Sequence, residues 1–190
     1  MESIGLKEWA IVCKALGRGR QSIIVRKGGL AEGRGGFSFR HREFFLFPTW
    51  FHEQPEKVRA TDIKFPFATP GKIKIDFFAR IDFVKTIHSW ETAQALEPLH
   101  ILKPEVVRER FEFEGAPGLH VALLRVFRVI PTWTIAEEKK YGGCRSWVNL
   151  PNPPADLRLE TVLGDSEHGS LRDRFVRLFT RSGAAATASD

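Results

Sequence analysis

An alternation of charged and apolar side chains is the feature that most constrains the fold of this chain. From Lys72 to Phe77 every second residue is apolar, and the pattern continues from Ala79 to Ile87. A period of two is typical of a strand with one buried face and one face in water. The segment from Leu119 to Ile130 is almost wholly apolar and rich in Val, Leu and Phe, which predicts a central strand.

Shorter elements surround these two strands in no regular order. Further strands are predicted over Arg20–Lys27 and Glu43–Phe47, and helices over Leu6–Leu16, Trp90–Leu96 and Pro104–Arg110. A doubly wound parallel sheet needs helices that alternate with its strands, and that alternation is missing here. The sequence therefore predicts an α+β fold with a mostly antiparallel, barrel-like sheet and flanking helices.

The length and composition favour one domain. The chain has 190 residues, of which 43% are hydrophobic, so it can bury a core. No linker long enough to divide it is present. We expect a single α+β domain over residues 1–165, a C-terminal amphipathic helix over 166–181 and a disordered tail over 182–190.

Several classes of protein are excluded or disfavoured. No apolar run reaches the roughly 18–20 residues that cross a bilayer, and the first residues lack the basic and apolar parts of a signal peptide. Cys13 and Cys144 are too few for a disulfide framework or a zinc site. We therefore expect a cytoplasmic protein with reduced thiols and no cofactor, although a single bridge between these two cysteines stays open.

The positive charge is concentrated in one segment. The net charge is +6 and the isoelectric point is about 9.6. Between Gly17 and Arg42 seven basic residues face a single acid, Glu32, and five glycines lie between Gly28 and Gly36. A local basic surface suits a polyanion such as nucleic acid, or it simply solvates glycine-rich turns. The predicted phosphate contacts are Arg20, Arg26, Lys27, Arg34, Arg40 and Arg42.

The segment after this basic stretch offers two kinds of chemistry. Trp50 follows Pro48-Thr49, and Trp50 or His52 could contact a base, since aromatic rings stack on bases. Alternatively, His41, Glu43, His52 and Glu53 could hold a divalent ion and activate water. The structural alternative is that these side chains bond to the protein itself. No complete catalytic motif is present.

Four short phrases follow one another between about residues 5 and 150. They are Gly5-Leu6-Lys7-Glu8-Trp9-Ala10, Ile24-Val25-Arg26-Lys27-Gly28-Gly29, Phe44-Phe45-Leu46-Phe47-Pro48-Thr49 with Phe51-His52, and Tyr141-Gly142-Gly143-Cys144-Arg145-Ser146-Trp147. In this combination the chain resembles an uncharacterised bacterial family, domain of unknown function 1802. The resemblance implies a setting in restriction–modification or defence, with a restriction-endonuclease-like partner.

A weaker resemblance concerns the fold. A helix, a basic strand such as Gln21–Arg26 and barrel-like strands are similar to PUA-like domains and their ASCH branch. That resemblance implies a small β-barrel that binds RNA or modified bases.

The leading hypothesis is a non-enzymatic module that binds DNA or RNA. Two other classes stay open: a metal-dependent nuclease or hydrolase that uses the His41 group, and a protein-interaction adaptor whose basic loop is incidental. Metal content separates the nuclease or hydrolase from the other two classes. Salt-dependent nucleic-acid binding separates the nucleic-acid-binding module from the adaptor.

Overall fold

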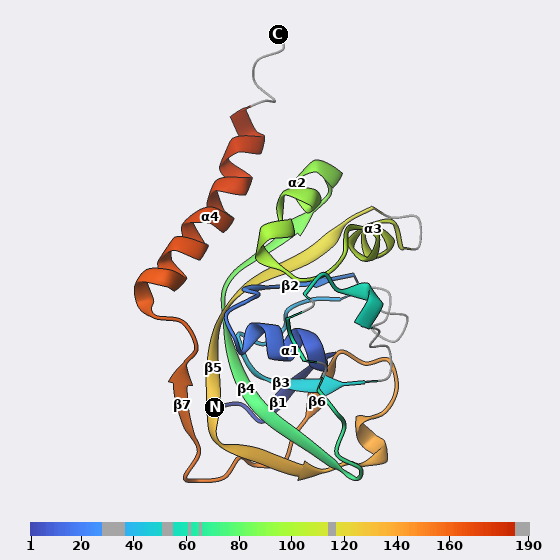
Figure 1. Ribbon diagram of the computed structural model, residues 1–190, viewed down its shortest axis with the longest axis vertical. Coiled ribbons are helices and arrows are strands. Elements are labelled where there is room, and N and C mark those ends of the chain that lie inside the picture. The colour runs from blue at the N-terminus through green and yellow to red at the C-terminus, as the bar shows by residue number, and fades with distance from the viewer. Residues whose placement is uncertain (28–36, 51–54, 61, 65, 114–116, 185–190) are drawn as a thin grey trace.

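Two long strands form the centre of the computed structural model, which describes residues 1–27, 37–50, 55–60, 62–64, 66–113 and 117–184, with side chains to residue 180 (Figure 1). They are β4 (Lys72–Ile87) and β5 (Leu119–Ala136), antiparallel from Lys72↔Ala136 to Ile87↔Leu119. The register shifts twice, between Ile75 and Phe77 and between Ile81 and Phe83. Such irregularities bend a strand pair, and Figure 1 shows both strands curving around the first helix.

Five shorter strands complete a seven-stranded sheet. Along the sheet the order is β2-β5-β4-β3-β1-β6, and β7 pairs with β5 beside this path. Only β1 and β3 run parallel; the other pairs in the described part of the chain are antiparallel. The strands are β1 (Ile4–Trp9), β2 (Ile23–Arg26), β3 (Glu43–Thr49), β6 (Trp147–Asn149) and β7 (Arg158–Thr161).

The described residues contain four α-helices and three short 3₁₀ turns. The α-helices are α1 (Ala10–Leu16), α2 (Trp90–Ala95), α3 (Pro104–Glu112) and α4 (Asp165–Ala184), and the turns are η2 (Pro55–Lys57), η3 (Glu97–Leu99) and η5 (Lys139–Tyr141). Helix α1 lies in the concave space of the sheet, and α4 projects away from the body (Figure 1). None of these helices has the length and apolarity to cross a membrane.

The sheet carries a hydrophobic cluster on each face. Along β3, Phe44 and Leu46 pack with α1, α2 and α3 on one side, whereas Phe45 and Phe47 pack into a second cluster. The second cluster includes Trp133 of β5 and residues that follow it in the chain. Because both faces are covered, β3 is apolar on both sides rather than alternating.

The sequence predicts the helices better than their boundaries. Ser89 caps α2, its Oγ accepting a hydrogen bond from the Thr92 amide at 3.2 Å, and α3 begins at Pro104, both as predicted. The predicted helix over Leu6–Leu16 is wrong in its first turn. Residues Leu6 to Trp9 belong to β1, because that segment pairs with both β3 and β6.

The predicted α+β class is confirmed, but the sheet is not a closed barrel. Its path ends at β2 on one side and at β6 on the other, and the described residues show no pairing between these two strands. The curvature of β4 and β5 brings the two edges near each other, and side chains span the remaining gap. The expectation of a barrel is therefore corrected to an open, strongly curved sheet.

The C-terminal segment and the cysteines complete the description. Helix α4 runs through the segment 166–181 that the sequence predicts as a helix, and it continues to Ala184. The rest of the predicted tail, 185–190, lies outside the described residues. Cys13 is buried and Cys144 exposed, and in the described part of the chain no disulfide joins them.

Candidate functional site

The predicted phosphate contacts and the predicted base contact Trp50 come from different ends of β3. Arg40 and Arg42 are exposed just before β3 begins, whereas Trp50 follows the end of that strand. Seven residues of extended chain lie between Arg42 and Trp50, so the two Cα atoms are about 26 Å apart. Arg20 is exposed after α1 and lies 3.2 Å from Asp62. Arg34 and His52 lie outside the described residues, so the structure does not place them.

Arg26 is engaged inside the protein. From the end of β2 its guanidinium donates to the Lys7 carbonyl at 3.2 Å and to Ser146 Oγ at 2.6 Å. It also lies 3.4 Å from the carboxylate of Glu8, whose side chain is only 2% exposed. These bonds leave Arg26 little capacity for a phosphate. The neighbouring Lys27 is partly buried.

A second arginine lies close to the same carboxylate. Arg110 of α3 donates to the Val25 carbonyl at 2.7 Å, and its guanidinium covers the ring of Trp9. Burial lowers the pKa of Arg110, and the charge of Glu8 opposes that effect. Glu8, Arg26 and Arg110 thus form a charged cluster between β1, β2 and α3, in which the Glu8 carboxylate stabilises both guanidinium groups while these two repel each other.

The described members of the predicted metal group have other partners. His41 Nδ1 lies 2.8 Å from a Glu2 carboxylate oxygen, and Glu43 forms an ion pair of 2.8 Å with Arg80. His52 and Glu53 lie outside the described residues. Where residues are described, no three His, Cys, Asp or Glu side chains gather closely enough to hold a metal.

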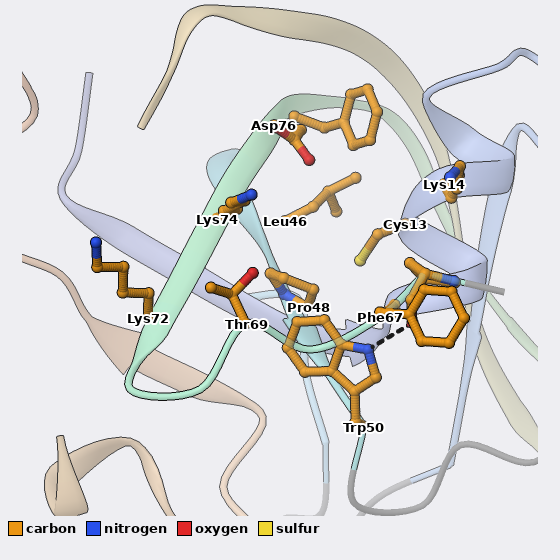
Figure 2. Close-up of a pocket in the computed structure, with 13 residues that line it drawn as sticks. Cys13, Lys14, Leu46, Pro48, Trp50, Phe67, Thr69, Lys72, Lys74 and Asp76 are labelled. Atoms are coloured by element: carbon orange, nitrogen blue, oxygen red, sulfur yellow. Dashed lines mark hydrogen bonds between the residues drawn. The ribbon is translucent and has the colours of Figure 1, made fainter. Parts of the chain in front are cut away.

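A pocket of about 150 Å³ opens between α1, the end of β3 and the start of β4 (Figure 2). The buried residues of its lining are Leu46 of β3 together with Cys13 and Ala10 of α1. The rest of the lining is Lys14, Pro48, Trp50, Pro66, Phe67, Thr69, Lys72, Lys74, Asp76 and Phe77. Of the predicted site residues that the structure describes, Trp50 alone lines this pocket.

Two aromatic side chains form one part of the pocket wall. Trp50 is partly exposed, and its Nε1 donates to the carbonyl of Pro66 at 3.0 Å (Figure 2). That bond ties the indole to the segment that carries Phe67. Phe67 is 91% exposed, the largest exposure among the described large hydrophobic residues. A ligand would therefore meet aromatic surface as it enters.

Three lysines surround the same pocket. Lys14 comes from α1 on one side, and Lys72 and Lys74 come from β4 on the other (Figure 2). Alternation along β4 turns residues 72, 74 and 76 toward this face while Ile73 and Ile75 enter the opposite core. Within the described residues none of the three lysines has an ion-pair partner. Asp76 is the acid of the pocket, and its Oδ1 accepts a hydrogen bond from Thr132 at 2.8 Å.

This combination suits a flat anionic ligand. Apolar and aromatic walls favour a ring, and unpaired ammonium groups at the rim favour negative charge beside it. The described residues bring no nucleophile and general base within hydrogen-bond reach of each other in this pocket.

Sequence reasoning missed the three lysines and Phe67. The alternation of lysine and isoleucine from Lys72 to Ile75 was visible, but alone it predicts only a half-buried strand. The lysines become a candidate site because the chain reversal at Gly71 (φ +69°) and α1 place them around Trp50. Pro70-Gly71 is the local sequence signal for the chain reversal, and no local signal predicts where α1 lies relative to it.

The sequence pattern of one family covers most of the chain. The family described as "Domain of unknown function (DUF1802)" matches residues 5–174. The chain belongs to this family. The resemblance carried by the four phrases is thereby confirmed. Comparison with curated proteins gives no match.

Solved structures that resemble this chain are ASCH domains, the kind of domain to which the weaker resemblance pointed. The ASCH protein from Zymomonas mobilis is 16% identical, with a TM-score of 0.41, covering 90% of this chain and 93% of that one. A serine-to-alanine mutant of the same protein gives 14% identity and a TM-score of 0.42, covering 90% and 94%.

Proposed function

We propose that this chain is a nucleic-acid-binding module without catalytic chemistry of its own. The observation that carries the proposal is the set of Lys14, Lys72 and Lys74, unpaired within the described residues, around a pocket that contains Trp50. Nucleic acids present phosphates at regular spacing beside flat rings. Ammonium groups next to aromatic surface are the elements from which sequence-tolerant nucleic-acid sites are built.

The basic segment supplies further contacts in this proposal. Arg20, Arg40 and Arg42 are exposed, and Lys27 and Arg34 flank or belong to the glycine-rich segment. His52 follows Trp50 closely in sequence and stays a proposed base contact. Arg26 stays a proposed phosphate contact, beside its bonds to β1 and Ser146.

Salt dependence tests the proposal directly. Each phosphate neutralised by a lysine contributes about −0.7 to the log–log slope of affinity against salt for a single strand. The triple variant Lys14→Ala, Lys72→Ala, Lys74→Ala should therefore bind a labelled oligonucleotide with a slope flatter by roughly 2. Fluorescence anisotropy over a salt series from about 50 to about 200 mM measures this difference.

A matched variant controls for net charge. Arg172, Arg174 and Arg177 of α4 are exposed and, in the part of the chain described, have no ion-pair partner. Their replacement by Ala removes the same charge far from the pocket, so the slope should stay within about 0.5 of the wild-type value. An equal flattening in both variants would show that the charge acts without a site. No measurable binding at low salt would reject nucleic-acid binding altogether.

The finer parts of the sequence hypothesis belong to this proposal as well. One such prediction is a PUA-like ancestry of the curved sheet. Another is a cellular setting in restriction–modification, with a restriction-endonuclease-like partner. Co-purification of such a partner with the full chain is the measurement that checks the cellular setting.

A further inference from the structure

The pocket beside Trp50 has properties that go beyond attraction of a polyanion. Phe67 lies at its edge almost fully exposed, and nothing in the packing of the described residues requires an aromatic ring there. Trp50 lines the same pocket only partly buried. One exposed ring on a surface is ordinary, but two rings that line one small pocket provide stacking surface for a ligand.

The hydrogen bonding of Trp50 limits how it can contact a ligand. An indole has a single donor, and here Nε1 already donates to Pro66. The ring is thereby held in place, and its faces and edges remain for contact. Trp50 can thus recognise a ring by stacking but contributes no hydrogen bond to a base edge.

The size of the pocket limits how much ligand enters. Its volume of about 150 Å³ lies below the roughly 300–1,000 Å³ of pockets that enclose a drug-sized molecule. Leu46 and Cys13 lie at its inner end (Figure 2). One ring system fits, whereas a whole nucleotide with sugar and phosphate does not. The phosphates must stay outside, where Lys14, Lys72 and Lys74 lie.

We infer that this pocket takes one unpaired base from single-stranded nucleic acid, while the three lysines contact the phosphates on either side of it. This inference rests on the proposed function and names its substrate class. Bases within a duplex are stacked and paired, so their rings reach such a pocket only after a costly extrusion. Thr69 and Asp76 are the polar groups near the ring besides the lysines. Preference among the four bases is accordingly small.

The decisive experiment compares two oligonucleotides that differ only in their bases. One is a 15-mer of thymidine, and the other is a 15-mer of abasic sites with the same phosphates. Stacking of one base corresponds to about 5- to 150-fold in affinity, so the wild-type chain should prefer the thymidine strand by a factor in this range. A 15-base-pair duplex should bind more weakly than the thymidine strand at equal salt.

Two variants test whether the preference for the thymidine strand over the abasic strand arises in the pocket. Phe67→Ala should lower affinity for the thymidine strand several-fold and leave affinity for the abasic strand unchanged, because Phe67 is exposed and the fold does not depend on it. Trp50→Ala should have the larger effect of the two. Phe113→Ala, at the end of α3 and 40% exposed, is the matched control and should change neither affinity.

The outcomes separate the inference from the proposed function. Equal affinity for the thymidine and abasic strands, or binding of duplex as tight as single strand, would reject the base pocket and leave electrostatic binding in place. A preference that survives both Phe67→Ala and Trp50→Ala would also reject it. Binding to none of the three ligands would reject the proposed function itself.

Discussion

Arg26 and Ser146 join the two edges of the open sheet through a hydrogen bond of 2.6 Å between guanidinium Nη2 and Oγ. Arg26 ends β2 at one edge, and Ser146 immediately precedes β6 at the other. The Ser146 carbonyl also accepts from the Lys7 amide at 2.8 Å. A side chain thus provides the link that backbone pairing provides in a closed barrel.

Replacement of Arg26 should destabilise the protein strongly. Arg26→Ala removes one of the two arginines beside the buried Glu8 carboxylate, and loss of one member of a buried pair costs about 3–5 kcal/mol. The closest approach of the pair is as long as 3.4 Å, and Glu8 also accepts a hydrogen bond from the Trp9 amide. We therefore expect a smaller loss of stability, about 2–4 kcal/mol. Urea unfolding measures this loss. A loss below about 1 kcal/mol would show that the link does not hold the sheet edges.

The fold was predictable where the signal was local. The alternation in β4, the apolar run in β5, the Ser89 cap and Pro104 at the start of α3 all act within a few residues. The strand β1 was not predictable, since Leu6, Trp9, Cys13 and Leu16 recur with helical spacing. Pairing with β3 and β6 decides its conformation, and that pairing joins segments about 40 and 140 residues apart.

The site was predictable only in part for the same reason. Trp50 could be singled out from its place after Pro48-Thr49, and it lines the pocket. The charge arithmetic drew attention to the arginines between Gly17 and Arg42, yet exposure and partners depend on tertiary structure. Arg26 turned inward, and lysines from two distant segments surround Trp50 instead.

Gly17 should tolerate no side chain. It ends α1 with ordinary helical angles, but a Cβ at this position would overlap the ring of Phe77. Gly17→Ala should therefore cost about 1–3 kcal/mol through overpacking. Gly169→Ala in α4, where a Cβ meets open space, should instead stabilise by about 0.5–1 kcal/mol.

If this explanation holds, thermal unfolding should show a lower melting temperature for Gly17→Ala and a higher one for Gly169→Ala than for the wild type. A double-mutant cycle adds a second check: in a Phe77→Leu background the cost of Gly17→Ala should fall by at least about 0.5 kcal/mol. No coupling between the two positions would show that the backbone, not the ring, is responsible.

Metal content separates the enzymatic alternative from binding. His41 faces Glu2 and Glu43 faces Arg80, so we expect zinc and manganese at background in the purified chain, by mass spectrometry of the metals. The variant His41→Ala with His52→Ala should show the same background. Stoichiometric metal in the wild type that disappears in this variant would support the nuclease or hydrolase hypothesis instead.

His100 should make stability depend on pH. It is 5% exposed, and burial, together with the nearby charges of Arg59 and Arg110, lowers its pKa from 6.5 to about 4. Its Nδ1 accepts a hydrogen bond from the Leu102 amide at 3.2 Å, which requires that nitrogen to be unprotonated. The folded protein therefore holds neutral His100 at pH values where the unfolded chain already binds a proton.

The direction of the effect follows from this difference in proton uptake. Between pH 6.5 and about 4 the unfolded state binds more protons, so stability falls as the pH falls through this window and levels off below it. The full contribution is about 3 kcal/mol. His100→Asn keeps an acceptor for the Leu102 amide but cannot titrate. Urea unfolding at pH 7, 6, 5 and 4.5 should show a smaller loss in this variant than in the wild type, and parallel pH profiles would mean that other groups cause the acid sensitivity.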